Sequence, residues 1–260
     1  VDISLIIRDD KSTDGTVDII RDLAKKHKNI QVVFDEKNIG ACLSFLRLIE
    51  ISENMEAEYY AFCDQDDIWL PEKIMEAIKT ISKSKMSYSD TPILYCSAVT
   101  FVDENLNIIR KSGLNDEKMT FEKSVFDNRS IGCTLVFNQA LIKKYLRFFK
   151  ENKDSVVMHD WTFVLLTLLT GEVMYDSESY IYYRQHSGNL VGGINKNKKL
   201  TSKLLDFYRT EIKGSTKHRS RQLLFINNIF ANDMSDYQLE FVNNFFEYYR
   251  KNIFFRMCFS

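Results

Sequence analysis

Three acidic residues crowd the short segment Asp64-Gln65-Asp66-Asp67, which directly follows the apolar run Tyr59 to Cys63. Carboxylates at this spacing repel one another unless a cation or a polar ligand lies among them. The apolar run predicts a strand, and open α/β sheets bind their ligands beyond the carboxyl ends of such strands. Two aligned carboxylates suit a hard divalent cation, Mg2+ or Mn2+, which in turn binds a diphosphate. We therefore predict a ligand site at this strand end.

The same segment has a simpler interpretation, a solvated loop in which Asp67 helps to cap the helix that follows Pro71. A solvated loop could use Asn, Ser or Gly without crowding negative charge, whereas here the acids are attached directly to an apolar strand. Because a cation would relieve the repulsion, we favour the ligand site and keep the solvated loop as the alternative.

A second acidic segment, Arg8-Asp9-Asp10-Lys11-Ser12-Thr13-Asp14-Gly15, follows the apolar run Ile3 to Ile7. It begins like a calcium-binding loop, but the twelfth position counted from Asp10 is Arg21, where such a loop needs a bidentate Glu. Calcium binding by this loop is therefore excluded. An Asx-type turn that caps the next helix explains Ser12 to Asp14 but not the pair Asp9 and Asp10, so a ligand contact stays open beside it.

Two later segments carry further candidate groups. Asp160, in His159-Asp160-Trp161, precedes a strongly apolar helical run, so it is either a helix cap or a general base that takes a proton from a substrate hydroxyl. Arg184 and His186 lie in a segment with the composition of a surface loop. Their functional interpretation is contact with a phosphate or a metal as the loop folds over the site.

The elements that would position these residues alternate between strand and helix. Apolar runs predict strands at 3–7, 30–34, 59–63, 93–102, 131–137 and 180–183, and helical spacing predicts helices at 17–24, 41–51, 74–81 and 158–169. Repeated strand-then-helix units predict an α/β fold with a mostly parallel, doubly wound central sheet flanked by helices. The pattern becomes mixed after Pro92, and beyond about residue 195 it is helical, first basic and then aromatic.

Composition narrows the class of protein. The chain has 260 residues, 45% hydrophobic and 27% charged, with a formal net charge of -1, which argues against disorder and against nucleic-acid binding by the whole surface. The 5 cysteines include no CxxC pair and are expected to be reduced. The sequence shows neither a run of about 18 apolar residues nor a signal-peptide pattern, so we expect a cytoplasmic location.

A basic stretch near the start of the helical region has two interpretations. Lys196, Lys198, Lys199 and Lys203 are typical of a solvated helical face. The alternative is attraction to anionic lipid headgroups or to a lipid-linked acceptor, which the aromatic tail from Phe245 to Phe255 would support. A peripheral position at the inner face of the cell membrane follows from this second hypothesis.

Taken together and in this order, the motifs resemble those of family 2 glycosyltransferases of the GT-A fold, in particular the rhamnosyltransferase-like members of bacterial polysaccharide synthesis. The resemblance covers about residues 3 to 195, so we expect a GT-A domain at 1–195 and a helical extension at 196–260. The matching segments are Arg8 to Thr16, Asn38-Ile39-Gly40, Phe62 to Trp69, His159-Asp160-Trp161 and Tyr183 to His186.

The resemblance implies roles for the residues of the nucleotide pocket. Asp10, together with Asp9, would hydrogen-bond the pyrimidine base, and Asn38 with Gly40 would shape the nucleoside pocket. Asp64 would contact the ribose or the diphosphate. A nucleotide-sugar donor is thereby the implied ligand.

The resemblance also implies the catalytic groups. Asp66 would bind Mg2+ or Mn2+, and His186 would complete the contacts to the metal or the diphosphate, beside Arg184. Asp160 would deprotonate the acceptor hydroxyl, so that a single displacement inverts the anomeric centre.

Family members carry another strand, a nucleotide contact and a helix ahead of the segment that begins here at Val1. In the family that strand lies within the central sheet. On this basis we expect a defective or empty nucleotide pocket in a chain that starts at Val1.

The implied function is metal-dependent, inverting transfer of a hexose, with L-rhamnose from dTDP-L-rhamnose as the expected donor. The implied acceptor is a hydroxyl of a growing cell-surface or lipid-linked glycan. One alternative is a catalytically impaired relative that acts as an assembly partner. Another is a sugar nucleotidyltransferase, although the glycine-rich loop typical of that class is missing from these residues. No motif sets the donor, the linkage or the oligomeric state.

Overall fold

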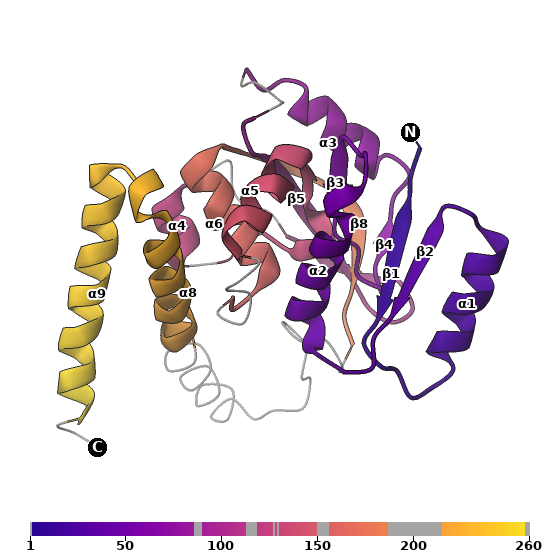
Figure 1. Cartoon of the computed structure of the whole chain (residues 1–260), viewed down its shortest axis with the longest axis horizontal. Helices are drawn as coiled ribbons and strands as arrows, with labels where there is room; N and C mark the ends of the chain where they lie inside the picture. The colour runs from indigo at the N-terminus through magenta and orange to yellow at the C-terminus, as the bar shows by residue number, and fades with distance from the viewer. Residues whose placement is uncertain are drawn as a thin grey trace.

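The computed structural model describes residues 2–85, 90–112, 119–126, 128, 130–149, 156–186 and 215–257. Two sheets and the helices that cover them extend from α1 at one end to α9 at the other (Figure 1). The strands are β1 (Leu5–Asp9), β2 (Ile30–Phe34), β3 (Tyr59–Ala61), β4 (Ile68–Trp69), β5 (Ile93–Val102), β6 (Ile108–Lys111), β7 (Val136–Asn138) and β8 (Glu172–Arg184). The helices are α1 (Thr16–Lys26), α2 (Gly40–Ile51), α3 (Lys73–Ile81), α4 (Phe121–Phe126), α5 (Gln139–Phe149), α6 (His159–Thr170), α8 (Ser215–Phe230) and α9 (Asp236–Met257), with 3-10 turns η1 (Ser52–Asn54), η2 (Gly132–Thr134) and η5 (Ala231–Asp233).

The N-terminal unit is a strand, a helix and a parallel strand. β1 pairs with β2 in a register that runs from Leu5 opposite Ile30 to Asp9 opposite Phe34. α1 lies beside β2 at the edge of the molecule and buries Ile20 (Figure 1). The strand–helix–strand order predicted from the hydrophobic pattern is confirmed here, although β1 begins two residues later than the apolar run does.

The larger sheet has 6 strands in the order β3-β7-β5-β8-β4, with β6 paired to β5. Of its described pairs, β5 with β8 is parallel and the others are antiparallel. The α/β class is therefore confirmed, but the prediction of a mostly parallel sheet is wrong for this part. Strand-then-helix alternation stops after α3, and from there the chain forms hairpins and returning strands that the alternation could not foresee.

The β5–β6 hairpin shows why the prediction failed. The segment after β5 is polar, yet Asp103 closes a turn by accepting hydrogen bonds from the amides of Asn105 and Asn107, both at 2.9 Å. That Asx-type turn brings β6 back along β5. In the same half, the predicted strand at 131–137 is instead the turn η2 followed by the short strand β7.

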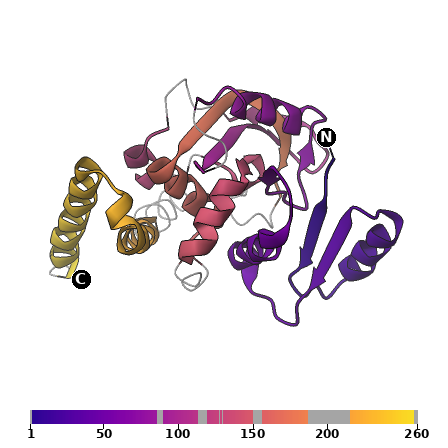
Figure 2. The same cartoon turned by 45° about the horizontal axis from the view of Figure 1, so that its top comes forward.

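The main core lies between the larger sheet and helices α2, α5 and α6 (Figure 2). Phe62, Phe137 and Phe163 meet there with ring centroids 5.0 to 5.3 Å apart. α6 is buried from His159 through Thr167, which accounts for its being apolar on all sides. The residues that follow β3 and those at the start of α6 are therefore attached to elements whose positions the core fixes.

The C-terminal helices pack on the same core. α8 and α9 contact α4, and Phe241 and Phe245 of α9 lie against Phe126 with centroid distances of 5.9 and 5.7 Å. Phe245, at the start of the aromatic tail, thus packs within the chain. The basic stretch at Lys196 to Lys203 lies outside the described residues. None of the described helices combines the length and the apolar character that crossing a bilayer demands.

Gly171, between α6 and β8, gives a stability prediction. A Cβ at this position would overlap the carbonyl oxygen of Pro92, a backbone atom that also accepts the amide of Glu172. We expect Gly171→Ala to lower the free energy of unfolding by about 3 kcal/mol, because the overlap is with backbone rather than a flexible side chain. Urea unfolding would measure it, with Gly15→Ala as the control, since a Cβ at Gly15 meets nothing within 4 Å. Equal stability of the two variants would contradict this account.

Candidate active site

The acidic loop, defined here as Asp64 to Asp67, is held at both of its ends. It follows Phe62, which is 4% exposed, and it leads into β4, which pairs with β8. From β8, the amide of Arg184 donates to Asp67 Oδ1 at 3.1 Å and its Nε donates to the carbonyl of Asp66 at 2.9 Å. The loop is therefore an ordered part of the fold, and the sequence-predicted Arg184 contacts it directly.

Asp66 and His186, both predicted from the sequence as metal ligands, lie side by side. Nε2 of His186 is 2.7 Å from Oδ2 of Asp66, and both side chains are partly exposed. The structure thus brings a nitrogen and a carboxylate oxygen together at one accessible place. Imidazole and carboxylate are both common ligands of divalent metals.

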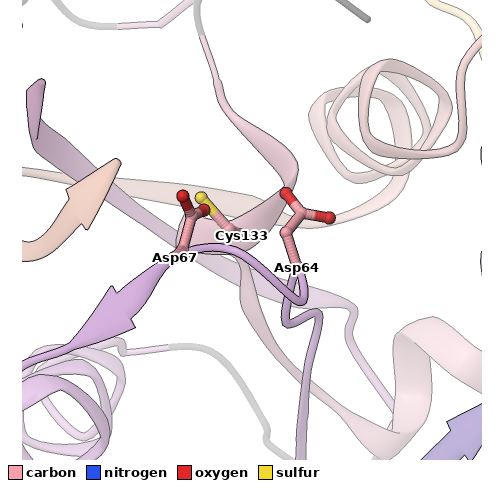
Figure 3. A group of neighbouring side chains, drawn as sticks. All are labelled: Asp64, Asp67 and Cys133. Carbon is pink, nitrogen blue, oxygen red and sulfur yellow. The ribbon is translucent and has the colours of Figure 1, made fainter. Parts of the chain in front are cut away.

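A second group joins the acidic loop to the turn η2. One ligand atom each from Asp64, Asp67 and Cys133 lie within 4.8 Å of one another. Figure 3 shows the thiol of Cys133 beside the carboxylate of Asp67, with Asp64 on its other side. The sequence did not connect Cys133 with the acidic loop, because the loop and the turn are far apart in the chain and only tertiary packing joins them.

Burial raises the pKa values of two carboxyl groups of the loop, those of Asp64 and Asp67. Burial, followed by the charges of Asp67, Asp66 and Asp160, raises the pKa of Asp64 to about 7. Burial also raises the pKa of Asp67, and hydrogen bonds from Cys133 and the Arg184 amide oppose it. The loop therefore binds a proton near neutral pH where no cation balances it.

Lys73 lies close to this group but does not neutralise it. Its side chain is 1% exposed, and Nζ lies 3.9 Å from the ring centroid of Trp69 without a hydrogen-bond partner among the described residues. Burial lowers the pKa of Lys73 to about 8. In the sequence, its burial is indicated by the four-residue spacing of Lys73, Ala77 and Ile81, which lie on the buried face of α3.

The predicted nucleotide-binding residues at the N-terminus form a compact turn. Asp10 accepts hydrogen bonds from the amides of Ile39 and Gly40 and from Arg8, each at 2.8 Å. Asn38 Oδ1 accepts from the Gly40 amide at 3.2 Å, and Gly40 has a φ of 79°, a region that favours glycine. Burial alone would raise the pKa of Asp10, but the Ile39 amide, Arg8 and the Gly40 amide together hold it below its usual range.

Asp9 and the residues after it form the Asx-type turn that was one of the two interpretations of this segment from sequence. Asp9 is buried at the end of β1 and its Oδ2 accepts from the Ser12 amide at 2.9 Å. Asp14 Oδ1 accepts from the amide of Thr16 at 3.0 Å, at the start of α1. The Asx-type turn is therefore present, and a ligand would meet Asp9 and Asp10 in a loop that is already ordered.

Asp160, the predicted base, lies in the first turn of α6 and faces the acidic loop. Its Oδ1 accepts a hydrogen bond from the amide of Trp161 at 2.6 Å. Its negative charge contributes to the raised pKa values of Asp64 and of Cys42, which lies on α2. Burial and this charge raise the pKa of Cys42 to about 11. α2 thus connects the N-terminal turn at Gly40 with the surroundings of Asp160.

The chain belongs to the family described as Glycosyl transferase family 2, whose sequence profile matches residues 2–149. That range includes the N-terminal turn and the acidic loop, whereas Asp160, Arg184 and His186 lie beyond it. Membership agrees with the α/β fold of GT-A type.

Individual relatives make the comparison more specific. The chain is 30% identical over 199 residues to the dTDP-rhamnosyl transferase RfbG of Shigella flexneri, an alignment that covers 74% of the chain and 66% of that protein. It is 30% identical over 133 residues to the putative teichuronic acid biosynthesis glycosyltransferase TuaG of Bacillus subtilis, covering 51% of the chain and 48% of that protein. The chain therefore spans about two thirds and about half of these relatives.

Among solved structures, the mannosyltransferase PcManGT from Pyrobaculum calidifontis, in complex with GDP-Man and Mn2+, is similar in fold. The TM-score is 0.52 at 12% sequence identity, with 85% of this chain and 54% of that chain covered. This similarity supports the fold class.

Proposed function

We propose that the chain transfers a sugar from a nucleoside diphosphate to a hydroxyl group, with a divalent cation bound at the acidic loop. The observation that carries the proposal is the convergence of Asp64, Asp66 and Asp67 with Asp160. Burial, followed by the charges of the other three, raises the pKa of Asp64 to about 7. Four carboxylates at one place call for positive charge. The Pyrobaculum enzyme, solved with GDP-Man and Mn2+, supports a nucleotide-sugar donor and a divalent cation.

The residues of the loop fit such a cation. Oδ2 of Asp67 is buried without a hydrogen-bond partner among the described residues, and Asp66 and His186 offer two adjacent ligand atoms. We assign Asp66 and His186 as metal ligands, and Asp64 and Arg184 as contacts of the ribose or the diphosphate. Mg2+ or Mn2+ held there would neutralise the charge that develops on the leaving diphosphate.

Asp160 is the proposed general base. The acceptor O–H proton passes to its Oδ2, the acceptor oxygen forms a bond to the anomeric carbon, and the bond from that carbon to the diphosphate oxygen breaks. The electron pair of that bond leaves with the nucleoside diphosphate. Attack from the face opposite the leaving group inverts the anomeric centre.

The N-terminal turn is the proposed nucleoside pocket. Asp9 and Asp10 would bind the pyrimidine base, and Asn38 and Gly40 would shape the wall beside it. Because Asp10 already accepts the amides of Ile39 and Gly40, its contact with the base would use its remaining lone pairs.

We extend the proposal to the donor, the acceptor and the location of the protein. The similarity to RfbG supports L-rhamnose from dTDP-L-rhamnose as the donor, and TuaG supports an acceptor in a cell-surface polysaccharide. A growing or lipid-linked glycan is the proposed acceptor, reached from the cytoplasm at the inner face of the cell membrane.

A thermal-shift screen tests the proposal. We expect dTDP and dTDP-L-rhamnose to raise the melting temperature in the presence of Mn2+, and UDP, GDP and ADP to raise it less, because the bound nucleotide stabilises only the folded state. A matching screen with EDTA should remove the shift. Failure of every nucleotide to shift the transition would contradict the enzyme assignment and favour an assembly partner without catalytic activity.

A further inference from the structure

The end of the β5–β6 hairpin presents three aliphatic side chains at the surface. Leu106 is 40% exposed, Ile108 is 64% exposed and Ile109 is 42% exposed. Single exposed apolar side chains are common on proteins and need no explanation, but these three lie together between positions 106 and 109. We call this group the aliphatic tip, and its exposure suggests contact with another molecule.

Leu106 stands at a backbone position that favours glycine. Its φ is 68°, in the left-handed region, where the Cβ of an L-residue comes too close to the following carbonyl oxygen. The Leu106 amide donates to the carbonyl of Asp103 at 3.0 Å, so Leu106 ends the four-residue turn that begins at Asp103. Glycine is the usual residue at such a position of a hairpin. The exposed leucine therefore costs the turn stability, which points to a role for its side chain outside the turn.

The shape of β6 argues against pairing with a strand of a second copy. Among the described strands β6 pairs with β5, so its other edge is open. The pairing with β5 skips Ile109, between Ile108 and Arg110, and thus contains a β-bulge. Bulges and basic side chains on an edge strand both disfavour the addition of another strand. The open edge is therefore a poor template for a further β-strand.

Basic side chains follow the aliphatic tip directly. Arg110 and Lys111 complete β6, and both residues are exposed. The acids of the turn are Asp103 and Glu104, and the Asp103 carboxylate accepts hydrogen bonds from two amides within the turn. Aliphatic side chains next to cations suit the interface of an anionic bilayer, because apolar groups enter the boundary of the acyl chains while cations meet the lipid phosphates.

We propose that the aliphatic tip inserts into the surface of an anionic lipid bilayer, with Arg110 and Lys111 against the lipid headgroups. Arg184 links the hairpin to the acidic loop, because its Nη1 donates to the carbonyl of Glu104 and its Nε to the carbonyl of Asp66, both at 2.9 Å. Docking of the tip thus holds the acidic loop near the bilayer. The inference rests on the proposed function for its purpose, access to a lipid-linked acceptor, and it names the surface that meets the membrane.

Two substitutions remove the tip while keeping the hairpin. Leu106→Gly deletes the side chain and relieves the left-handed backbone, so the urea midpoint of unfolding should stay the same or rise. Ile108→Thr replaces an exposed apolar side chain by a polar one that still favours strands. Ile19→Thr is the matched control, because Ile19 is 63% exposed, nearly as much as Ile108, and lies on α1.

Co-sedimentation of the full chain with sucrose-loaded vesicles measures the docking. We expect binding to vesicles of phosphatidylcholine and phosphatidylglycerol, and weaker binding to phosphatidylcholine alone. The double variant Leu106→Gly with Ile108→Thr should bind about tenfold or more weakly and Ile19→Thr within about twofold of wild type, because binding scales with the apolar area that enters the bilayer. Arg110→Gln with Lys111→Gln should weaken binding to the vesicles that contain phosphatidylglycerol.

Several results would overturn the proposal. Wild type that stays in solution with phosphatidylglycerol vesicles would do so, as would an equal loss of binding in Ile19→Thr. A lower urea midpoint for Leu106→Gly would show that the leucine supports the fold. A dimer in solution that Ile108→Thr dissociates would assign the tip to a second copy instead.

The dTDP-induced thermal shift in the presence of Mn2+ keeps this inference separate from the proposed function. The shift should be the same in wild type and in all of these variants, because none of them changes a residue assigned to the nucleotide or the metal. Absence of the shift from the wild type would contradict the proposed function, whereas the vesicle assay judges the aliphatic tip by itself.

Discussion

Replacement of Asp160 by Asn is expected to lower sugar transfer by about a thousandfold while nucleotide binding persists. The amide of Asn can still accept the Trp161 amide hydrogen bond that holds Oδ1 at 2.6 Å, so the first turn of α6 is preserved. It cannot accept a proton from the acceptor hydroxyl, and loss of a general base costs about two to four orders of magnitude. Initial rates with dTDP-L-rhamnose and an acceptor would measure the loss, beside a thermal shift with dTDP.

A matched control is Asp236→Asn, which removes an exposed carboxylate from the first turn of α9. It repeats the chemical change in the first turn of another helix, so it separates the effect of the site from the effect of removing a charge at a helix start. The assignment of the base is wrong if Asp160→Asn turns over as fast as Asp236→Asn.

Replacement of Asp66 by Asn is expected to remove both transfer and the metal dependence of nucleotide binding. The variant loses one negative ligand oxygen 2.7 Å from Nε2 of His186, although its amide can still hydrogen-bond the imidazole. A divalent cation contributes several kcal/mol to stabilising the charge of a transition state, so we expect transfer to fall about a hundredfold or more. Removal of metal from the wild type with EDTA should give the same result, and added Mn2+ should restore only the wild type.

The result for Asp66→Asn also distinguishes between the two groups of candidate metal ligands. If Asp66→Asn keeps a Mn2+-dependent dTDP shift, the cation is held by Asp64, Asp67 and Cys133, whose ligand atoms lie within 4.8 Å of one another. Cys133→Ser would then weaken Mn2+ binding, whereas the assignment to Asp66 and His186 predicts little change. Isothermal titration with MnCl2 would decide between them.

The sequence predicted those parts of the site that are local in the chain. An apolar run followed by acids placed the loop at Asp64 to Asp67 at a strand end, and the all-round apolar character after Asp160 predicted the buried helix α6. Side chains brought together by packing carried no such signal. Cys133 reaches Asp67 from the turn η2, and its neighbours in sequence are ordinary core residues.

Strands stabilised by pairing were equally hard to foresee. β4 has two residues and exists because Ile68 and Trp69 pair with β8. β8 itself continues through the polar residues Asp176 to Glu178, where its register with β5 shifts, so only its aromatic end was predicted. Hydrophobic periodicity reports burial, and these segments are held by backbone hydrogen bonds to neighbours instead.

Helix α2 joins the two halves of the proposed site through adjacent residues. Ser44 Oγ accepts from Arg8 at 2.7 Å, within the network that holds Asp10, and the next residue, Phe45, stacks on His159. Two adjacent residues of one helix therefore contact both the turn that holds Asp10 and the imidazole beside Asp160.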